Sequence, residues 1–394
     1  MKIEKPEIKN TNVVNKIYLD NAATTPIDPE VVNAMIPVMQ NQFGNPSSIH
    51  SWGREVKTAI ENSRKLVAKL LNVAPAEIFF TSGGTEANNM ALFCSVRDLG
   101  VKYVISSKIE HHAVLHTLEE LEKEGKIRLG LVELDEKGHV KLDHLEELLK
   151  NSTEKTLVSL MHANNEIGNI LSIKMVGELC GKYNAFFHCD TVQTMAHYPF
   201  DLKEINVHFI TCAAHKFHGP KGVGFLYINH RVKINPFIFG GAQERNMRGG
   251  TENVYGIVGL AKAMEIAYSH VEEHQQQISD LKKYMAGQLM STIKGLQFNG
   301  DSNGNSLYTV LNVAFPPTDF SEMLLFNMDI AGIACSGGSA CSSGSNSGSH
   351  VLRALYDNAD RPSIRFSFSK YSTKEEIDVV VEKLKELYSE KVTH

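Results

Sequence analysis

The sequence predicts an α/β protein with two parts: a large domain built on a mostly parallel sheet, and a smaller α+β domain. Between about residues 28 and 230, short apolar segments alternate with amphipathic segments whose apolar residues recur three or four positions apart. That alternation is typical of parallel strands covered by helices on both faces. From residue 253 onward the pattern changes to one long helical stretch and a few separate strands. The chain of 394 residues is long enough for two or three domains of about 150 residues each.

The elements of the large domain are predicted from periodicity and from the turn residues between them. Residues 28–42, 54–72 and 85–99 are predicted helices because their apolar positions fall on one helical face. The predicted strands are short apolar segments bounded by turn residues. They are residues 77–80, 102–106, 127–134, 156–162, 185–188, 207–213 and 222–228.

The last third of the chain has a different organisation. Residues 253–294 have helical periodicity over about forty positions, a length that indicates either a helix bridging two domains or two helices. Further strands are predicted at 307–315, 333–335 and 364–369, and a final helix at 373–391. In residues 336–349, 11 of 14 positions are Gly or Ser. Such a segment cannot pack into a core, so it is predicted to be a mobile loop.

Composition and charge exclude several classes of protein. Hydrophobic residues make up 42% of the chain and charged residues 22%, which is typical of a globular rather than a disordered protein. The net charge of −5 provides no basic field for nucleic acid or an anionic membrane, so neither is an expected partner. No secretory signal or stretch of about 18 apolar residues is visible, and the six cysteines form no C-x-x-C pair. We therefore expect a cytoplasmic protein with a small ligand.

A candidate anion site lies between a predicted strand and the helix that follows it. The segment Thr81-Ser82-Gly83-Gly84-Thr85-Glu86 places glycines and a hydroxyl where free backbone N–H groups and the helix dipole attract negative charge. The same residues also make an ordinary helix start, so both interpretations stay open at this point. Neither G-x-x-x-x-G-K-[ST] nor G-x-G-x-x-G occurs here, which argues against nucleotide hydrolysis and dinucleotide binding.

Two charged residues that follow predicted strands are candidates for one site. Asp190 comes directly after the strand at 185–188, and Lys216 follows the strand at 207–213. Because the carboxyl ends of parallel strands meet at one edge of a sheet, both side chains are expected to face the same crevice. A lysine desolvated there can act as an amine nucleophile, whereas a solvated lysine after a strand has no such role.

The sequence also contains a histidine pair with metal-ligand spacing and one cysteine that is a candidate reactive thiol. His112 and His116 lie four positions apart on a predicted helix, but no third ligand follows at useful spacing, so no metal is expected. Cys341 lies in the Gly/Ser segment, whereas Cys94 and Cys180 fall in predicted helices. Buried thiols are usually inert, whereas a thiol on a mobile loop can reach a bound substrate. Cys341 is therefore either a reactive thiol or an ordinary surface cysteine.

Ten short motifs follow one another along the chain. They are YLDNAATT from Tyr18, FGNPSS from Phe43, SGGTEANN from Ser82, EH from Glu110, NNEIG from Asn164, H-x-D-x-x-Q from His188, HKFHGPKG from His215, RGGTEN from Arg248, SGGSACSSG from Ser336 and SIRFS from Ser363. In order and spacing they resemble the cysteine desulfurases of the NifS/IscS type, which are fold-type I enzymes that use pyridoxal 5′-phosphate (PLP). The resemblance extends from Ile17 to the last predicted helix.

The resemblance implies a PLP-dependent transferase-like fold with a seven-stranded sheet, and a cofactor site in the large domain. The implied cofactor-binding residues are Gly84, Thr85, His111, Asn165, Asp190, Gln193, His215, Lys216 and Thr251. Lys216 would bind PLP covalently and later move the Cα proton of the substrate, and Asp190 would pair with the ring nitrogen. Gln193 would contact the ring oxygen, and His111 would stack on the ring and assist proton transfer.

The remaining implied roles concern phosphate, substrate and a second subunit. Gly84, Thr85 and His215 would hold the phosphate, and Thr251 would reach the phosphate of the other subunit in a homodimer. Asn165 and Arg365 would bind the substrate carboxylate, the arginine by a bidentate pair.

The implied reaction ends on a thiol. Cys341 would take the sulfur of L-cysteine as a persulfide and leave L-alanine, so the implied catalytic residues are Lys216, Cys341 and His111. The sulfur would pass to an acceptor such as an iron–sulfur scaffold protein, or to tRNA thiolation. The large domain is expected at residues 16–264, and the small domain at residues 1–15 and 265–394, which carry Cys341.

Three alternatives and one departure accompany this interpretation. A selenocysteine lyase, another fold-type I PLP enzyme such as an aminotransferase, and an inactive sulfur carrier that binds a scaffold protein remain alternatives. The family pattern usually has serine three residues before the PLP lysine, and this chain has Ala213. One hydrogen bond to the phosphate is therefore expected to be absent, unless Ser82, Thr85, Thr251 or water replaces it.

Overall fold

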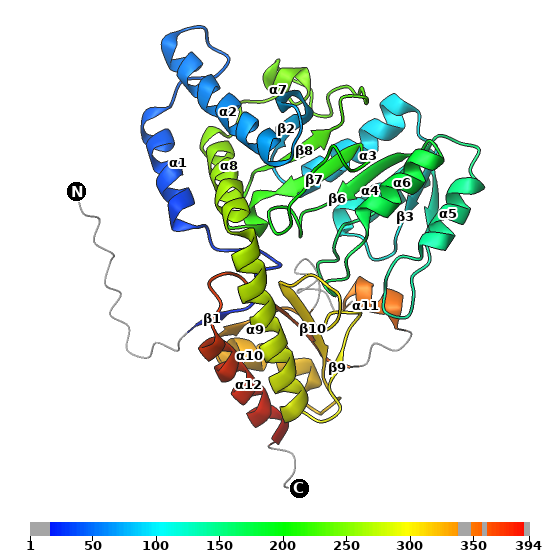
Figure 1. Cartoon of the computed structure of the whole chain (residues 1–394), viewed down its shortest axis with the longest axis vertical. Coiled ribbons are helices and arrows are strands. Elements are labelled where there is room, and N and C mark those ends of the chain that lie inside the picture. Colours follow the sequence, from blue (N-terminus) through cyan, green and yellow to red (C-terminus); the bar gives the residue numbers. More distant parts are fainter. Residues whose placement is uncertain (1–15, 338–347, 357–360, 390–394) are drawn as a thin grey trace.

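A computed structural model describes residues 16–337, 348–356 and 361–389 (Figure 1). Its largest sheet has seven strands in the order β2-β8-β7-β6-β5-β3-β4. The strands are β2 (Ile78–Thr81), β3 (Tyr103–Ser106), β4 (Arg128–Leu131), β5 (Thr156–Ser159), β6 (Phe186–Asp190), β7 (Phe209–Ala213) and β8 (Gly224–Ile228). Only β8 runs against its neighbours within this sheet. The predicted mostly parallel seven-stranded sheet is confirmed.

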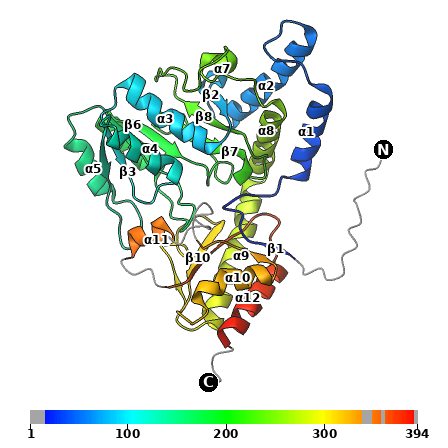
Figure 2. The ribbon, with the colours of Figure 1, turned by 180° about the vertical axis from the view of Figure 1, so that it is seen from behind.

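Helices cover both faces of this sheet because its strands are apolar on both sides. One face packs against α1 (Pro29–Asn41), α2 (Ser51–Leu70), α5 (Leu142–Lys150), α6 (Ile173–Lys182) and α8 (Val254–Ser269). The other face packs against α3 (Gly84–Leu99) and α4 (His112–Lys123), which Figure 2 shows in front of the strands. The predicted α/β architecture is therefore a three-layer arrangement.

Capping residues explain where the first helices begin. The Asp28 side chain accepts a hydrogen bond from the Glu30 N–H, and Pro29 occupies the first position of α1, as expected of a helix start. Helix α2 begins at Ser51, three residues before the prediction, because the His50 ring accepts from the Gly53 N–H. Histidine is not among the usual N-cap residues, so the sequence pattern did not indicate this earlier start.

Most of the chain after residue 270 forms a smaller unit with its own core. Three antiparallel strands pair in the order β12-β10-β9, namely β9 (Gln297–Phe298), β10 (Val310–Ala314) and β12 (Ser363–Ser367). Helices α9 (Val271–Thr292) and α12 (Lys374–Ser389) pack on each other and into this core. Short helices α7 (Gln243–Asn246), α10 (Leu324–Ile330) and α11 (His350–Leu355) complete the described elements.

Two details differ from the sequence-based expectation. Strand β9 was not predicted, because two residues are too few to show a period. The strand predicted at 333–335 is β11 (Ile333–Ala334), and it pairs in parallel with β1 (Ile17–Tyr18) rather than with β10 or β12. Ile17 and Leu19 are buried in the core of the smaller unit. The division of the chain into domains at residues 16 and 265 stays a prediction.

The long helical stretch from 253 to 294 consists of two helices. Helix α8 ends at Ser269 and α9 starts at Val271, with a break at His270 (φ −126°). Figure 1 shows α8 beside the large sheet and α9 continuing downward to the smaller unit. The stretch is thus two helices, as one of the alternatives predicted, and the pair also runs from the large sheet to the smaller unit. No helix in the described ranges has the length and apolar character needed to cross a membrane.

A buried ion pair connects α2 to the loop that contains α7. The Arg64 guanidinium is 2% exposed and makes two bonds to the Glu244 carboxylate, at 2.7 and 2.8 Å. Glu244 Oε2 also accepts the N–H of Phe80 on β2, and Arg64 also donates to the Ile78 carbonyl. Each charge is costly to bury alone, so removal of one partner leaves an uncompensated ion.

We predict that Arg64→Met lowers the free energy of unfolding by about 3–5 kcal/mol, because Glu244 then stays buried without its cation. Urea denaturation measures this loss. The double variant Arg64→Met/Glu244→Gln should recover most of it, since glutamine keeps an acceptor for Phe80. Lys123→Met, which removes an exposed pair with Glu120, is the control and should change stability by less than about 1 kcal/mol. An Arg64→Met effect no larger than this control would contradict the argument.

Candidate active site

A cavity of about 250 Å³ lies at the carboxyl ends of β6 and β7. Asp190 is the last residue of β6, and Lys216 ends a short 3₁₀ turn directly after β7. The cavity brings together Gly84, Thr85, His111, Asn165, Asp190, Gln193, His215, Lys216 and Arg365 from distant parts of the sequence. The expectation that Asp190 and Lys216 face one crevice is confirmed.

The anion corner of the cavity is the start of α3. Gly83 precedes the helix with φ +149°, a conformation that favours glycine, and Gly84 is the first helical residue. A Cβ on Gly84 would lie 2.8 Å from a Val192 methyl group, so this position admits little more than hydrogen. The helix N-terminus, with Thr85 next to it, therefore points free N–H groups into the cavity, as an anion site requires.

His215 is a neutral member of this corner. Its Nδ1 lies 3.1 Å from the Thr24 hydroxyl, and its carbonyl accepts from the Thr25 N–H and hydroxyl. Burial, together with the charges of Lys216 and Lys221, lowers the pKa of His215 to about 4. The ring is thus uncharged at neutral pH and offers hydrogen bonds rather than positive charge.

Two donors hold the Asp190 carboxylate. Asn88 Nδ2 donates to Oδ2 at 2.7 Å, and the Val192 N–H donates to Oδ1 at 2.9 Å. Asn88 was not singled out from the sequence, although it lies within SGGTEANN and one helical turn after Gly84, on the cavity face of α3. That spacing was the available signal, since residues i and i+4 of a helix share a face.

The Lys216 amine is held by the backbone of an N-terminal motif. Its Nζ donates to the carbonyl of Ala22 at 2.6 Å and to that of Ala23 at 2.8 Å. Gln193 Nε2 donates to the same Ala22 oxygen at 3.0 Å. Thr25 also binds the segment after Lys216, because its hydroxyl accepts the His218 N–H at 2.8 Å. YLDNAATT and HKFHGPKG therefore form one structure around the amine.

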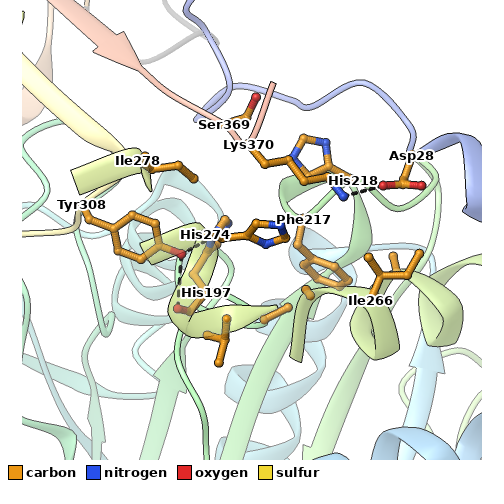
Figure 3. Close-up of a pocket in the computed structure, with 14 residues that line it drawn as sticks. Asp28, His197, Phe217, His218, Ile266, His274, Ile278, Tyr308, Ser369 and Lys370 are labelled. Carbon is orange, nitrogen blue, oxygen red and sulfur yellow. Dashed lines mark hydrogen bonds and ion pairs between the residues drawn. The ribbon is translucent and has the colours of Figure 1, made fainter. Parts of the chain in front are cut away.

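Close to the turn that carries Lys216, His197, His218 and His274 line a small cavity of about 30 Å³ (Figure 3). His197 Nε2 lies 3.1 Å from the Lys216 carbonyl, and its Nδ1 lies 3.0 Å from the Tyr308 hydroxyl. Burial lowers the pKa of His197 to about 4, so the ring is neutral. A carbonyl only accepts, so Nε2 carries the hydrogen and Nδ1 accepts from Tyr308. His197 thus ties the lysine turn to the smaller unit.

His111 begins helix α4 at the cavity wall. Its Nδ1 accepts the Ala113 N–H at 3.1 Å, so the neutral ring carries its hydrogen on Nε2. Burial lowers the pKa of His111, while the nearby Asp190 acts in the opposite direction. A neutral imidazole with its hydrogen on Nε2 can donate a hydrogen bond there and can accept a proton on Nδ1 only if the bond from Ala113 is given up.

Arg365 and Asn165 form a further part of the cavity wall. Arg365 is 1% exposed, and its Nη1 donates to the Asn165 carbonyl at 2.9 Å. Its Nη2 lies 2.9 Å from Asp20 Oδ1, while Nε has no hydrogen-bond partner among the described residues. The guanidinium therefore retains donors for a carboxylate in the cavity.

Two singled-out residues lie elsewhere. Thr251 is exposed and lines a separate cavity of about 150 Å³ beside Ser82, so it does not reach the Lys216 cavity of its own chain. Cys341 lies outside the described residues, and its role stays a prediction. Cys94 and Cys180 are buried as expected, and burial raises the pKa of the Cys94 thiol to about 12, which makes it unreactive.

The histidine pair is stacked rather than arranged around an ion. The rings of His112 and His116 have centroids 4.7 Å apart, and His350 lies 4.3 Å from His112. Within the part of the chain that the structure describes, no group of three potential ligands has the arrangement needed to hold a metal.

The donors and acceptors of the Lys216 cavity fit PLP. Asn88 and Arg365 line it, and each keeps one buried polar atom, Oδ1 and Nε, that pairs with nothing in the described ranges, so polar groups are concentrated at this cavity. The helix α3 terminus suits a phosphate, and the fixed Asp190 carboxylate suits a protonated ring nitrogen. A lysine after a central strand completes the set. Fold and site together define a fold-type I PLP enzyme.

Comparison with known proteins identifies the family. The sequence profile of the aminotransferase class-V family matches residues 17–380. The chain is 42% identical to "Cysteine desulfurase IscS" of Dictyoglomus turgidum over 94% of both chains. It is also 42% identical to "Cysteine desulfurase IscS" of Methanosarcina thermophila, over 98% of this chain and 96% of the relative.

Solved structures agree with this family. A "NIFS-LIKE PROTEIN" superposes with a TM-score of 0.87 at 38% identity, over 94% of this chain and 99% of that chain. The structure titled "SspA in complex with cysteine" has a TM-score of 0.78 at 30% identity, over 91% of this chain and 100% of that chain. The chain belongs to the aminotransferase class-V family, among its cysteine desulfurases of the IscS and NifS type.

Ala213 provides a test of the anion corner. It is buried at the cavity wall, and a Cβ on Gly84 would lie 3.6 Å from the Ala213 methyl group. We predict that Ala213→Ser adds a hydroxyl donor beside the phosphate and lowers the Kd of PLP about tenfold or more, as a hydrogen bond to a charged group allows. Equilibrium dialysis of the apoprotein measures the Kd. Ala213→Cys, a weak donor of similar size, is the control, and equal Kd values for all three proteins would contradict the prediction.

Proposed function

We propose that this protein is a PLP-dependent cysteine desulfurase that converts L-cysteine to L-alanine and leaves the sulfur as a persulfide on Cys341. The observation that carries the proposal is the cavity where the Lys216 amine, the Asp190 carboxylate and the Arg365 guanidinium converge. The near-full-length similarity to proteins named cysteine desulfurase supports the substrate.

In this proposal each wall of the cavity holds one part of PLP. Gly84, Thr85 and His215 hold the phosphate, Asp190 pairs with the ring nitrogen, and Gln193 contacts the ring oxygen. His111 stacks on the ring, and Lys216 bonds to it covalently. When bound, PLP supplies an electron sink that stabilises negative charge on the α-carbon of the amino acid.

The remaining polar groups bind the substrate and move its protons. Arg365 and Asn165 hold the carboxylate and so fix the α-carbon near Lys216. The Lys216 amine, once free of its bond to the cofactor, would take the Cα proton. His111 assists proton transfer, because its ring, once protonated, can return a proton to the substrate.

Cys341 completes the reaction by accepting sulfur. Its thiolate attacks the sulfur of bound cysteine, and the new S–S bond replaces the C–S bond. The electron pair of the C–S bond stays on the carbon, which takes up a proton and becomes the methyl group of alanine. We propose that the persulfide sulfur then passes to an iron–sulfur scaffold protein or to tRNA thiolation, and that the enzyme works in the cytoplasm.

We further propose that two copies of the chain form a homodimer. Apolar side chains are unusually exposed where α1 meets α2, with exposed fractions of 74% at Phe43, 91% at Ile49 and 52% at Trp52. The Phe43 and Trp52 rings have centroids 4.8 Å apart, and exposed apolar groups gathered in this way are typical of an interface. The exposed Thr251 is then available to reach the phosphate of the second subunit.

One prediction separates the cofactor lysine from the sulfur-accepting thiol. Lys216→Ala should abolish the visible absorbance of lysine-bound PLP and all sulfide release. Cys341→Ser should keep that absorbance, because PLP binding does not need the thiol, but should release less than about 1% of the sulfide from L-cysteine with a thiol reductant. Mass spectrometry of the parent protein after exposure to L-cysteine should find one added sulfur atom on Cys341.

Several results would contradict this assignment. Sulfide release by Cys341→Ser at the rate of the parent protein would exclude the persulfide and would favour a selenocysteine lyase. Alanine production without added sulfur on any cysteine would favour another PLP enzyme of this fold. Absence of PLP binding by the parent protein would favour an inactive sulfur carrier.

The homodimer has its own test. Ile49→Glu should shift the sedimentation coefficient from dimer to monomer, because a buried unpaired carboxylate is costly at an interface. Its PLP should also dissociate faster, since Thr251 of the partner is lost. Val379→Glu, on the exposed face of α12, is the control and should leave the dimer intact. A dimeric Ile49→Glu protein would contradict the proposed interface.

A further inference from the structure

The Arg365 guanidinium already has a carboxylate partner from this chain. Arg365 lies on β12, is 1% exposed, and forms an ion pair with Asp20 through Nη2 at 2.9 Å. Nη1 is occupied by the Asn165 carbonyl at 2.9 Å. A buried guanidinium needs such partners, because its isolated charge is costly in the protein interior. The arginine is therefore neutralised before any substrate carboxylate arrives.

Asp20 is held in place independently of Arg365. Its backbone forms a bridge with Ser367 at the end of β12, and the Tyr18 hydroxyl contacts its carbonyl at 3.2 Å. The Ser336 hydroxyl donates to the same oxygen, Oδ1, at 2.8 Å. Oδ1 thus serves two donors at once, the Arg365 Nη2 and the Ser336 Oγ, which share its negative charge.

Asp20 lies behind the guanidinium and not in the cavity. Arg365 lines the Lys216 cavity, whereas Asp20 does not. Each Nη of Arg365 carries two N–H groups, and the Asn165 carbonyl and Asp20 take one each, so the guanidinium keeps donors for a ligand. A substrate carboxylate can therefore bind Arg365 without displacing Asp20, but the positive charge that it meets is already partly offset.

The partial neutralisation of Arg365 by Asp20 has a kinetic consequence, because the substrate and the product each carry an α-carboxylate. L-cysteine and L-alanine carry the same α-carboxylate, so a stronger arginine would bind both equally. Such uniform binding does not accelerate the chemical step and slows release of the product. A charge that weakens carboxylate binding to both therefore favours turnover.

We propose that Asp20 is a positioning residue that sets the affinity of Arg365 for amino acid carboxylates and so allows alanine to leave. The proposal rests on the proposed function, because it takes Arg365 as the site of the substrate carboxylate. It concerns a residue 345 positions away from the arginine in the sequence.

The experiment uses the PLP-loaded protein and compares two ligands. L-alanine carries a carboxylate and ethylamine does not, and each perturbs the visible absorbance of the cofactor on binding. Asp20→Asn keeps an oxygen for Ser336 and Arg365 but removes the charge, so the Kd of L-alanine should fall at least fivefold. The Kd of ethylamine should stay within twofold. The KM for L-cysteine should fall while kcat does not rise, a split that a general loss of structure would not produce.

Two further variants keep the test decisive. Ser336→Ala removes the donor that competes for Oδ1, which strengthens the hold of Asp20 on Arg365, so the Kd of L-alanine should rise about twofold. This variant tests the proposal from the opposite direction if Asp20→Asn does not fold. Asp329→Asn removes an exposed charge from α10 and is the control, with all constants unchanged.

The proposal is overturned if Asp20→Asn binds L-alanine with unchanged or lower affinity, or if the affinities for alanine and ethylamine change equally. It is also overturned if Ser336→Ala lowers the Kd of L-alanine or leaves it unchanged. Failure of the proposed function looks different, because a parent protein that is not a desulfurase would release no sulfide from L-cysteine, whatever Asp20→Asn does to the Kd of L-alanine.

Discussion

Segment 20–25 is the constraint on which the rest of this structure depends. It crosses between the two sheets and forms hydrogen bonds with both of them. Toward the smaller unit, Asn21 Nδ2 donates to the Ser367 carbonyl at 2.8 Å, and the Ala22 N–H donates to the Ser367 hydroxyl at 2.8 Å. Toward the large sheet, the Ala22 and Ala23 carbonyls accept from Lys216. The position of the lysine therefore depends on both parts of the molecule.

The same segment contacts Lys216 and Arg365 through different kinds of group. Backbone carbonyls accept from Lys216, and these dipoles favour its N–H groups without supplying a counter-charge. The carboxylate of Asp20 pairs with Arg365 and supplies a full counter-charge. Segment 20–25 thus offers neutral carbonyls to the lysine, a proposed base and nucleophile, and a charged carboxylate to the arginine, a proposed binding group. His197, Tyr308 and the Lys216 carbonyl form a second, neutral connection behind the turn.

Much of the fold followed from periodicity. Strands that were short apolar segments and helices with one apolar face appeared where they were predicted, because burial on two faces or on one face leaves a clear pattern. The misses were elements without a period, such as β9 with two residues, or with an unusual cap, such as His50 before α2. Strand β4 is shorter than the predicted 127–134.

In the site, Asp190 and Lys216 could be predicted to meet, because both follow strands of one parallel sheet. The roles of Asn88 and Asp20 could not, since their partners lie 102 and 345 positions away. The sequence by itself determined which residue types were available: an amine, a carboxylate, a guanidinium and a glycine-led helix start. Only the tertiary structure decided their pairing, tautomers and charge balance. Those properties depend on distances and burial between segments far apart in the chain, which local patterns do not encode.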